Sequence, residues 1–501
     1  MKPGTDRNQS ACPARTSRAG ETIGPLLAIV LGMLFAQGCR SSRAPTAPEV
    51  VGPVRAEPGD ALVFSAASVD PRGDILSYLF CWGDTSAVEW SPFYPSGATV
   101  TRTHRFLEMG RCTVTVRSRN TGLLESRWSE PHELVIGPLC SRARTYGGGG
   151  RDELWSVEAD ADGGFVMAGF TESYGSGGRD AWLVKTDASG REIWSRTYGG
   201  PGDEWLTSVR QTSDHGYILA GYVESFGAGG SDAWLIRTDA SGDSLWTRTY
   251  GGEEPDAAAA ALQTQDGGYV MVGYTGSCGV VDSDAWMVKT DAAGGEVWRR
   301  AFGSEGDDWV WSVEQTPDGG YILAGGSAPP TANRYCWAVK TDAFGHTVWT
   351  RVFAGDGGTW IWSARPTTDG GYILLAGAEP VPGNAEIWLI KADALGDTVW
   401  SRTYGDDDRD WARDVRQTAD GGFIVAGDTR SGVTGEYDVW LIKTDPRGDT
   451  AWTRRFGGDK DEFGMGVRQT PDGGYVVVGH TQSYGAGAAD GLFLRTDDDG
   501  E

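Results

Sequence analysis

The stretch Lys185-Thr-Asp-Ala-Ser-Gly-Arg-Glu-Ile-Trp194 decides the fold, because the same phrase returns through most of the chain. Its aspartate recurs in steps of 51 or 52 residues, at Asp187, Asp239, Asp291, Asp342, Asp393, Asp445 and Asp497. Every copy keeps Asp-x-x-Gly, and six of the seven place a tryptophan four residues after the glycine: Trp194, Trp246, Trp298, Trp349, Trp400 and Trp452. A fixed period of this length indicates a repeat architecture.

Each repeat divides into four short stretches in which apolar residues alternate with small or polar ones, as in half-buried β-strands. In the second repeat they are residues 206–212, 216–222, 233–238 and 245–250. An Asp-x-Gly turn separates the first two stretches in all copies, and tight hairpins favour Asp and Gly. Seven units of four antiparallel strands predict an all-β fold, a seven-bladed β-propeller over residues 140–501.

The two ends of the repeat region complement each other. The last copy stops at Glu501 after a third strand and its turn, whereas residues 142–148 have the wording of a fourth strand. Pairing these N- and C-terminal strands would complete the last blade and remove its open edges. We therefore expect the ring to be closed by strands from both ends of the region.

Composition limits the partners of the protein. The 501 residues carry a net charge of −25, which disfavours nucleic acid and anionic membrane surfaces and leaves cation binding open. Glycine (75) and tryptophan (22) are abundant, as expected for short strands joined by turns. Seven cysteines are too few for a disulfide scaffold, although isolated bridges are compatible with export.

Residues 1–38 are predicted to be an export signal. The apolar run from Ile23 to Ala36 follows a basic segment and is too short to span a bilayer comfortably. Its end, Ala36-Gln-Gly-Cys39, resembles the bacterial lipobox, which implies a diacylated Cys39 and a protein anchored by lipid at the outer membrane or cell surface. The alternative is an ordinary cleaved signal and a secreted protein. Residues 39–52, rich in Pro and Ser, are predicted to be a flexible tether.

Residues 53–138 lack the repeat and are predicted to form a small immunoglobulin-like β-sandwich. The phrases Trp82-Gly-Asp-Thr85, His104-Arg-Phe106 and Gly110-Arg-Cys-Thr-Val-Thr-Val116 resemble a PKD domain, and Ser126-Arg-Trp-Ser129 is similar to fibronectin type III domains. This resemblance implies a spacer or adhesive module. It also implies that Cys81 and Cys112 lie on neighbouring strands, where an exported protein is able to bridge them.

The Asp-x-x-Gly-x-x-x-Trp phrase resembles two propeller devices. One is the tryptophan-docking motif of quinone-dependent dehydrogenases and of the barrel-assembly lipoprotein, and the other is the Asp-box of sialidases. Spacings here differ by one residue from those of both. Both devices are structural turns that lock a blade, so the resemblance implies packing and no catalysis. The whole repeat over residues 140–501 is similar to repeats of secreted bacterial and archaeal proteins.

Acidic and aromatic residues gather around the start of the first strand of the repeats, on the channel face of a propeller. The ligand-binding candidates are Asp152, Glu204, Trp205, Asp308, Trp309, Trp360, Asp410, Trp411 and Glu462. Carboxylates interleaved with tryptophan suit sugar stacking, cationic peptides or Ca²⁺. The alternative is that the acids only cap turns and keep a glycine-rich rim soluble.

Catalysis has little support in the sequence. The repeats contain three histidines, His215, His346 and His480, at unrelated positions, which disfavours a histidine relay or a His-rich metal site. No cofactor is predicted, with Ca²⁺ left open by the acidic rim. We expect a monomeric, non-catalytic binding or scaffold protein for protein or carbohydrate ligands, without a nucleic acid partner. The alternative is a glycan-active hydrolase that uses carboxylates on the channel face.

Overall fold

The computed structural model of the chain describes residues 44–52, 55–56, 62–84, 88–106, 110–136, 143–277, 283–303, 305–330, 333–353, 358–381, 384–405, 409–430 and 436–501. The chain divides into two compact units, residues 1–139 and 140–501. Regular structure in the described residues is entirely β, and no helix among them is long and apolar enough to cross a membrane. The predicted export signal, Cys39 and Cys278 lie outside the described residues.

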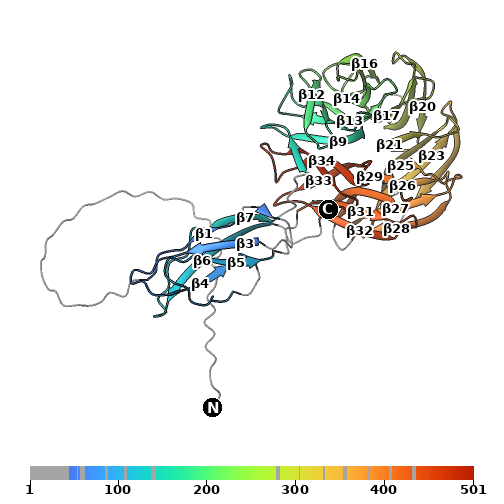
Figure 1. The fold of residues 1–501 in the computed structure, drawn as a ribbon. Helices are drawn as coiled ribbons and strands as arrows, with labels where there is room; N and C mark the ends of the chain where they lie inside the picture. The colour runs from blue at the N-terminus through green and yellow to red at the C-terminus, as the bar shows by residue number, and fades with distance from the viewer. Residues whose placement is uncertain are drawn as a thin grey trace, which may run out of the picture. The chain divides into compact units, whose positions relative to one another are not determined.

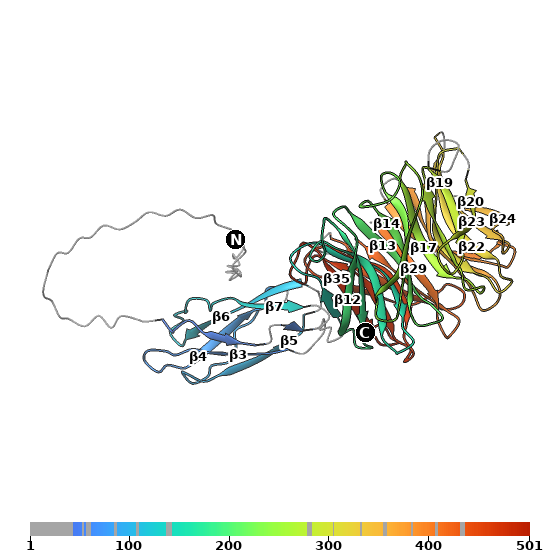
Figure 2. The same cartoon turned by 90° about the horizontal axis from the view of Figure 1, so that it is seen from above.

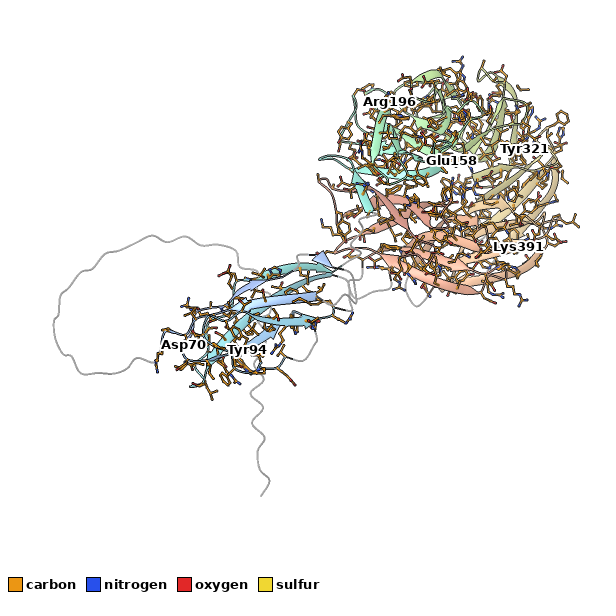
Figure 3. The ribbon with its side chains drawn as sticks, in the orientation of Figure 1. Asp70, Tyr94, Glu158, Arg196, Tyr321 and Lys391 are labelled. Atoms are coloured by element: carbon orange, nitrogen blue, oxygen red, sulfur yellow. The ribbon has the colours of Figure 1, made fainter. Side chains whose placement is uncertain are left out.

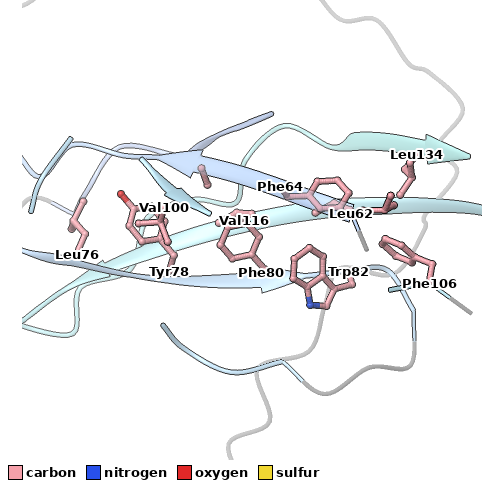
Figure 4. Packing of buried hydrophobic residues seen from close by; sticks show 12 residues of the cluster. Leu62, Phe64, Leu76, Tyr78, Phe80, Trp82, Val100, Phe106, Val116 and Leu134 are labelled. Atoms are coloured by element: carbon pink, nitrogen blue, oxygen red, sulfur yellow. The ribbon is translucent and has the colours of Figure 1, made fainter. Parts of the chain in front are cut away.

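The first unit contains a sheet of order β1-β3-β5 and a sheet of order β2-β7-β6-β4. Their strands are β1 (Glu49–Val51), β2 (Arg55–Ala56), β3 (Leu62–Ala67), β4 (Leu76–Cys81), β5 (Val100–His104), β6 (Gly110–Asn120) and β7 (His132–Ile136). Phe64 of β3 belongs to the same buried cluster as Phe80 of β4 and Val116 of β6 (Figure 4). Side chains from both sheets therefore share one core, as in a β-sandwich.

The structure corrects part of the predicted tether and does not form the predicted disulfide, because Cys112 is not bridged to Cys81. Residues 49–51 form β1 and pair with β3, because Val50 packs against the core cluster. The Pro- and Ser-rich composition of the segment did not reveal this contact. Cys81 ends β4 and Cys112 lies near the start of β6, and these two strands pair antiparallel.

The described residues of the second unit form seven four-stranded antiparallel sheets. Six sheets follow chain order, β9 to β12, β13 to β16, β17 to β20, β21 to β24, β25 to β28 and β29 to β32. Their strands are β9 (Asp152–Ala159), β10 (Phe165–Thr171), β11 (Asp180–Thr186), β12 (Glu192–Tyr198), β13 (Glu204–Gln211), β14 (Tyr217–Val223), β15 (Asp232–Thr238), β16 (Ser244–Tyr250), β17 (Asp256–Gln263), β18 (Tyr269–Thr275), β19 (Asp284–Thr290), β20 (Glu296–Phe302), β21 (Asp307–Gln315), β22 (Tyr321–Ala328), β23 (Tyr335–Thr341), β24 (Thr347–Phe353), β25 (Thr359–Pro366), β26 (Tyr372–Val381), β27 (Asn384–Ala392), β28 (Thr398–Tyr404), β29 (Asp410–Gln417), β30 (Phe423–Thr429), β31 (Asp438–Thr444) and β32 (Thr450–Phe456).

The seventh sheet combines strands from both ends of the unit, β33 (Glu462–Gln469), β34 (Tyr475–Thr481), β35 (Asp490–Thr496) and β8 (Ala143–Tyr146). Tyr146 of β8 lies opposite Gly491 of β35 and is buried in a cluster with Phe493. The first strands of successive sheets contact one another, and β33 contacts β9. The sheets thus follow one another around a common centre (Figure 1, Figure 2).

The repeated Asp-x-x-Gly and Trp phrase joins neighbouring sheets. Trp194 of β12 packs on Gly242, in the last turn of the next sheet, where an added Cβ would lie 2.7 Å from the indole. Tyr198 donates a hydrogen bond of 2.5 Å from its hydroxyl to the carbonyl oxygen of Gly242. This glycine has a φ of +79°, which residues with a side chain rarely adopt. The same contact joins Gly294 to Trp246, Gly345 to Trp298, Gly396 to Trp349, Gly448 to Trp400 and Gly500 to Trp452.

We predict that this docking glycine contributes more to stability than a glycine needed only for its backbone conformation. Gly396 (φ +81°) meets Trp349 at 2.8 Å, whereas Gly370 (φ +85°) has no atom within 4 Å of an added Cβ. Gly370→Ala is expected to lower the free energy of unfolding by about 1 kcal/mol, from backbone strain alone. Gly396→Ala should lower it by about 3 kcal/mol, because its Cβ also displaces the indole. Urea denaturation measures both, and equal losses would contradict the docking role.

Candidate functional site

The first strand of every sheet in the second unit carries a β-bulge at the same place in the repeat. In β9, Leu154 pairs with Gly169 and Ser156 with Ala168, which leaves Trp155 unpaired. The seven residues in this position are Trp155, Thr207, Ala259, Trp311, Trp362, Arg413 and Met465. All seven line one cavity of about 110 Å³. Because bulges redirect side chains, the repeat builds a shared cavity from one residue of each sheet.

A glycine on the second strand makes room for the bulge. An added Cβ on Gly169 of β10 would collide with the carbonyl oxygen of Glu153 in β9. Gly221 and Gly427 meet the first strands of their own sheets in the same way. In six of the seven sheets a glycine at this place of the second strand therefore allows the close approach of two backbones that the bulge requires, and Ala376 stands there in the fifth.

Aromatic rings and one guanidinium group gather around the cavity. The ring centroids of Trp311 and Trp362 lie 5.5 Å apart. The guanidinium carbon of Arg413 lies 5.1 Å from the ring centroid of Trp362. Trp155 packs edge-on against Trp205 with a centroid distance of 5.3 Å. These rings are only partly buried, so part of each tryptophan surface is open to a ligand.

Charged side chains at or near the position three residues after each bulge form a closed loop of ion pairs. The residues at this position are Glu158, Arg210, Leu262, Glu314, Arg365, Arg416 and Arg468. The loop runs from Glu158 to Arg210, Glu314, Arg365, Asp414, Arg468 and back to Glu158. It joins six of the seven sheets, and the third contributes Leu262 instead. Figure 3 places Glu158 toward the centre of the second unit and Arg196 and Lys391 toward its periphery.

Arg416 gives this loop a surplus positive charge. Its Nε lies 3.3 Å from Asp414 Oδ2, but Asp414 also pairs with Arg365 and Arg468. Burial, followed by the neighbouring charge of Arg468, lowers the pKa of Arg416 to about 9. Burial alone would raise the pKa of Glu158, yet Arg468 and Arg210 bring it down to about 2. The carboxylates are therefore fully ionised at neutral pH, and positive charge remains in excess.

The five acidic candidates from the sequence lie inside the protein, where Asp152, Glu204 and Glu462 cap turns, and their role as ligand contacts stays a prediction. Asp152, Glu204, Asp308, Asp410 and Glu462 are all buried. Asp152 accepts hydrogen bonds from the Gly148 amide at 2.9 Å and the Ser173 hydroxyl at 2.6 Å. Glu204 accepts one from the Gly200 amide at 2.8 Å. By accepting hydrogen bonds from backbone amides, these carboxylates fix the turn that precedes the first strand.

The four tryptophan candidates remain partly exposed and lie on the same strands as the cavity residues. The rings of Trp360 and Trp411 pack against each other at an angle of 32°, with centroids 5.0 Å apart. The guanidinium group of Arg413 lies 5.8 Å from Trp411, and that of Arg334 lies 5.9 Å from Trp309. Trp205 contacts Trp155, and Arg413 lies against both Trp411 and Trp362. None of the four candidates lines the cavity itself, whereas Trp155, Trp311 and Trp362 do, and the sequence analysis did not single out these three.

Sequence analysis also missed a group of buried titratable residues near Arg413. Asp428 of β30 lies opposite Trp411, and its Oδ1 is 3.3 Å from Arg413 Nε. Burial raises the pKa of Asp428 to about 6, although Arg413 opposes the shift. His480 of β34 occupies the matching place in the last sheet, and burial lowers its pKa to about 4. Aligning the repeats would have revealed both, since aromatic residues or glycine stand at this place elsewhere.

Among the described residues, no group of three or more His, Cys, Asp or Glu side chains is arranged to hold a metal ion. Asp152 and Glu204 of the acidic rim cap turns, and Ca²⁺ binding stays a prediction.

Comparison with known proteins gives partial likenesses. No protein-family model matches the chain. Regulatory protein FlaEY of Caulobacter vibrioides is 24% identical over 196 residues, which are 36% of this chain and 20% of that protein. The chain therefore matches about a fifth of the length of this curated relative.

Two solved structures are similar in part. The PKD domain of an M14-like peptidase from Thermoplasmatales archaeon SCGC AB-540-F20 is 28% identical and covers 19% of this chain and 98% of that domain, with a TM-score of 0.18. A mutant apocarotenoid oxygenase of Synechocystis is 11% identical and covers 74% of this chain and 91% of that one, with a TM-score of 0.33. The structural neighbours of this all-β chain thus include a PKD domain and a carotenoid-oxygenase propeller fold.

Proposed function

We propose that the second unit is a seven-bladed β-propeller, closed by β8, whose central cavity binds a protein or carbohydrate ligand without chemical turnover. The succession of first-strand contacts and the pairing of β8 with β35 support the closed ring. The observation that carries the binding role is the convergence of Trp155, Trp311 and Trp362 on one cavity. Partly exposed indole faces that meet in a concave site suit the stacking of sugars or apolar peptide side chains.

The binding role is tested on glycan and peptide arrays. Trp311→Ala should weaken binding of any recognised ligand by about 10- to 100-fold, as the loss of a central aromatic anchor does. Phe344→Ala is the matched control, because Phe344 is an exposed aromatic residue that does not line the cavity. Binding that survives Trp311→Ala but is lost when the first unit is altered would assign the function to the first unit.

A glycan-active hydrolase is the second candidate, and one observation favours it. Asp428 is fully buried with a pKa of about 6, and its Oδ2 has no hydrogen-bond partner, as suits a carboxyl group that donates a proton. Its partner Arg413 lines the cavity. Incubation with oligosaccharides separates the two functions, since an enzyme releases product that Asp428→Asn abolishes, whereas a binding protein releases none.

We also propose that the protein is exported and anchored through a lipid on Cys39. The apolar run that ends in Ala36-Gln-Gly-Cys39 supports this proposal. Mass spectrometry of protein extracted from membranes should find a diacylated N-terminal Cys39. An unmodified N-terminus beyond residue 39 would contradict the proposal and favour the secreted alternative.

A further inference from the structure

The cavity of the second unit is positively charged in a strongly acidic protein. Its lining includes five guanidinium groups, those of Arg210, Arg365, Arg413, Arg416 and Arg468. The carboxylates that pair within the loop are Glu158, Glu314 and Asp414. Asp428 offsets the charge of Arg413, so the four remaining arginines face three carboxylates and leave an excess of one, whereas the whole chain carries −25. Such a local reversal of sign attracts anions into the cavity.

Three hydrogen-bond donors on one strand face this cavity without a partner. Ser363 is 2% exposed, and its Oγ makes no hydrogen bond. Arg365 Nε and Trp362 Nε1 are also buried without a partner. All three residues belong to β25 and line the cavity, because the bulge turns successive residues toward it. A buried donor without an acceptor is costly, and an oxygen placed between these groups would satisfy them.

The size of the cavity limits what enters it. A water molecule accounts for about 30 Å³ of the liquid, so a cavity of about 110 Å³ holds a few waters or one small polyatomic group. A larger ligand therefore places only one such group deep in the cavity and rests its body on the tryptophan rings that line it. Arginine recognises carboxylate, sulfate and phosphate groups through charge-assisted hydrogen bonds.

From these observations we propose that the cavity is an oxyanion site. Arg416, Arg365 and Ser363 bind a carboxylate, sulfate or phosphate group, either as a free anion or as the acidic group of a ligand whose body lies on Trp311 and Trp362. If the anion is the acidic group of a larger ligand, the ligand is an acidic carbohydrate. This version of the proposal rests on the proposed binding function. The bound anion neutralises the surplus positive charge of Arg416.

Calorimetric titration of the full chain with sodium sulfate, acetate and glucuronate, at constant ionic strength in chloride, tests the proposal. At least one of these anions should bind with a stoichiometry of one. Arg416→Met should weaken binding by more than 10-fold, and Ser363→Ala by about three- to tenfold. Arg196→Met is the matched control, because Arg196 lies on the outer strand β12 and does not line the cavity. Absence of binding, or equal binding to Arg416→Met, would overturn the proposal.

The sugar arm distinguishes a free anion from an acidic ligand. If glucuronate binds at least 10-fold more tightly than acetate, and Trp311→Ala removes only this difference, the ligand is an acidic carbohydrate. If the two bind equally and Trp311→Ala has no effect, the site takes a free oxyanion and the tryptophan-based function fails while the oxyanion site stands. If glucose or another neutral sugar binds in a manner that depends on Trp311 while none of the anions binds, the oxyanion site is refuted and the proposed function stands.

Discussion

A chain that begins at Gly149 will melt about 10 °C below one that begins at Cys140, because only the longer chain contains β8. Without β8, Phe493 loses the cover of Tyr146, whose own side chain is buried. The lost apolar burial and strand pairing amount to about 5 kcal/mol, and each kcal/mol shifts the melting temperature of a large domain by about 2 °C. The free edge of β35 should also promote aggregation.

Scanning calorimetry of the two truncated chains at low concentration measures this difference, and light scattering measures aggregation. Tyr146→Phe in the full chain is the control, because it keeps the ring and removes only the hydrogen bond from the Tyr146 hydroxyl to Gly190 O. That variant should lose about 1 kcal/mol. Equal melting temperatures for the two truncated chains would mean that β8 does not complete the seventh sheet.

Asp414→Asn is expected to lower the free energy of unfolding at pH 7 by about 4 kcal/mol, because it leaves buried guanidinium groups without their shared carboxylate. Asp414 pairs with Arg365, Arg416 and Arg468. Removing the surplus positive charge of Arg416 should not lower the free energy of unfolding. Arg416→Met should leave stability unchanged or raise it, since it relieves repulsion between arginines without orphaning a carboxylate. Urea denaturation of both variants measures the contrast.

The same loop predicts how stability depends on pH. Although burial opposes ionisation, the arginines hold the pKa of Asp414 well below its usual range and that of Glu158 at about 2. A carboxylate with a lower pKa in the folded state stabilises the protein fully above its unfolded pKa, about 4. This stabilisation is lost as pH falls from about 4 through the folded values. The deficit of Asp414→Asn relative to the wild type should therefore shrink below about pH 4, and a constant deficit down to pH 2.5 would contradict the ion-pair assignment.

The repeat made most of the architecture predictable from sequence. The Asp187 phrase and its period set the number of units, and the alternating residues set four strands in each, which the four-stranded sheets match. The phrase that contains Gly242 was expected to form a turn that locks a blade, but the sequence did not show that Gly242 contacts Trp194 of the preceding sheet. A turn is a local property of the backbone, whereas a contact between sheets depends on how two repeats pack.

The candidate site, in contrast to the architecture, was mostly not predictable from the sequence. Acids such as Asp152 and tryptophans such as Trp309 looked alike as surface residues, yet only the tryptophans kept exposed area. Burial of Asp152 follows from turn amides that point inward, and nothing in the residue type announces it. Arg416 was not singled out because the residues of neighbouring sheets that line the cavity lie about 50 positions apart in the chain.

By itself, the sequence determined the strands, their hairpin turns and the period, because these depend on alternation and on the backbone preferences of Asp and Gly over a few residues. Only the tertiary structure decided that the bulged residues of separate sheets share one cavity and that Glu158, Arg210 and Asp414 join one loop of ion pairs. The reason is that charge and burial act between side chains brought together by the packing of whole sheets. One strand carries only one member of each such cluster.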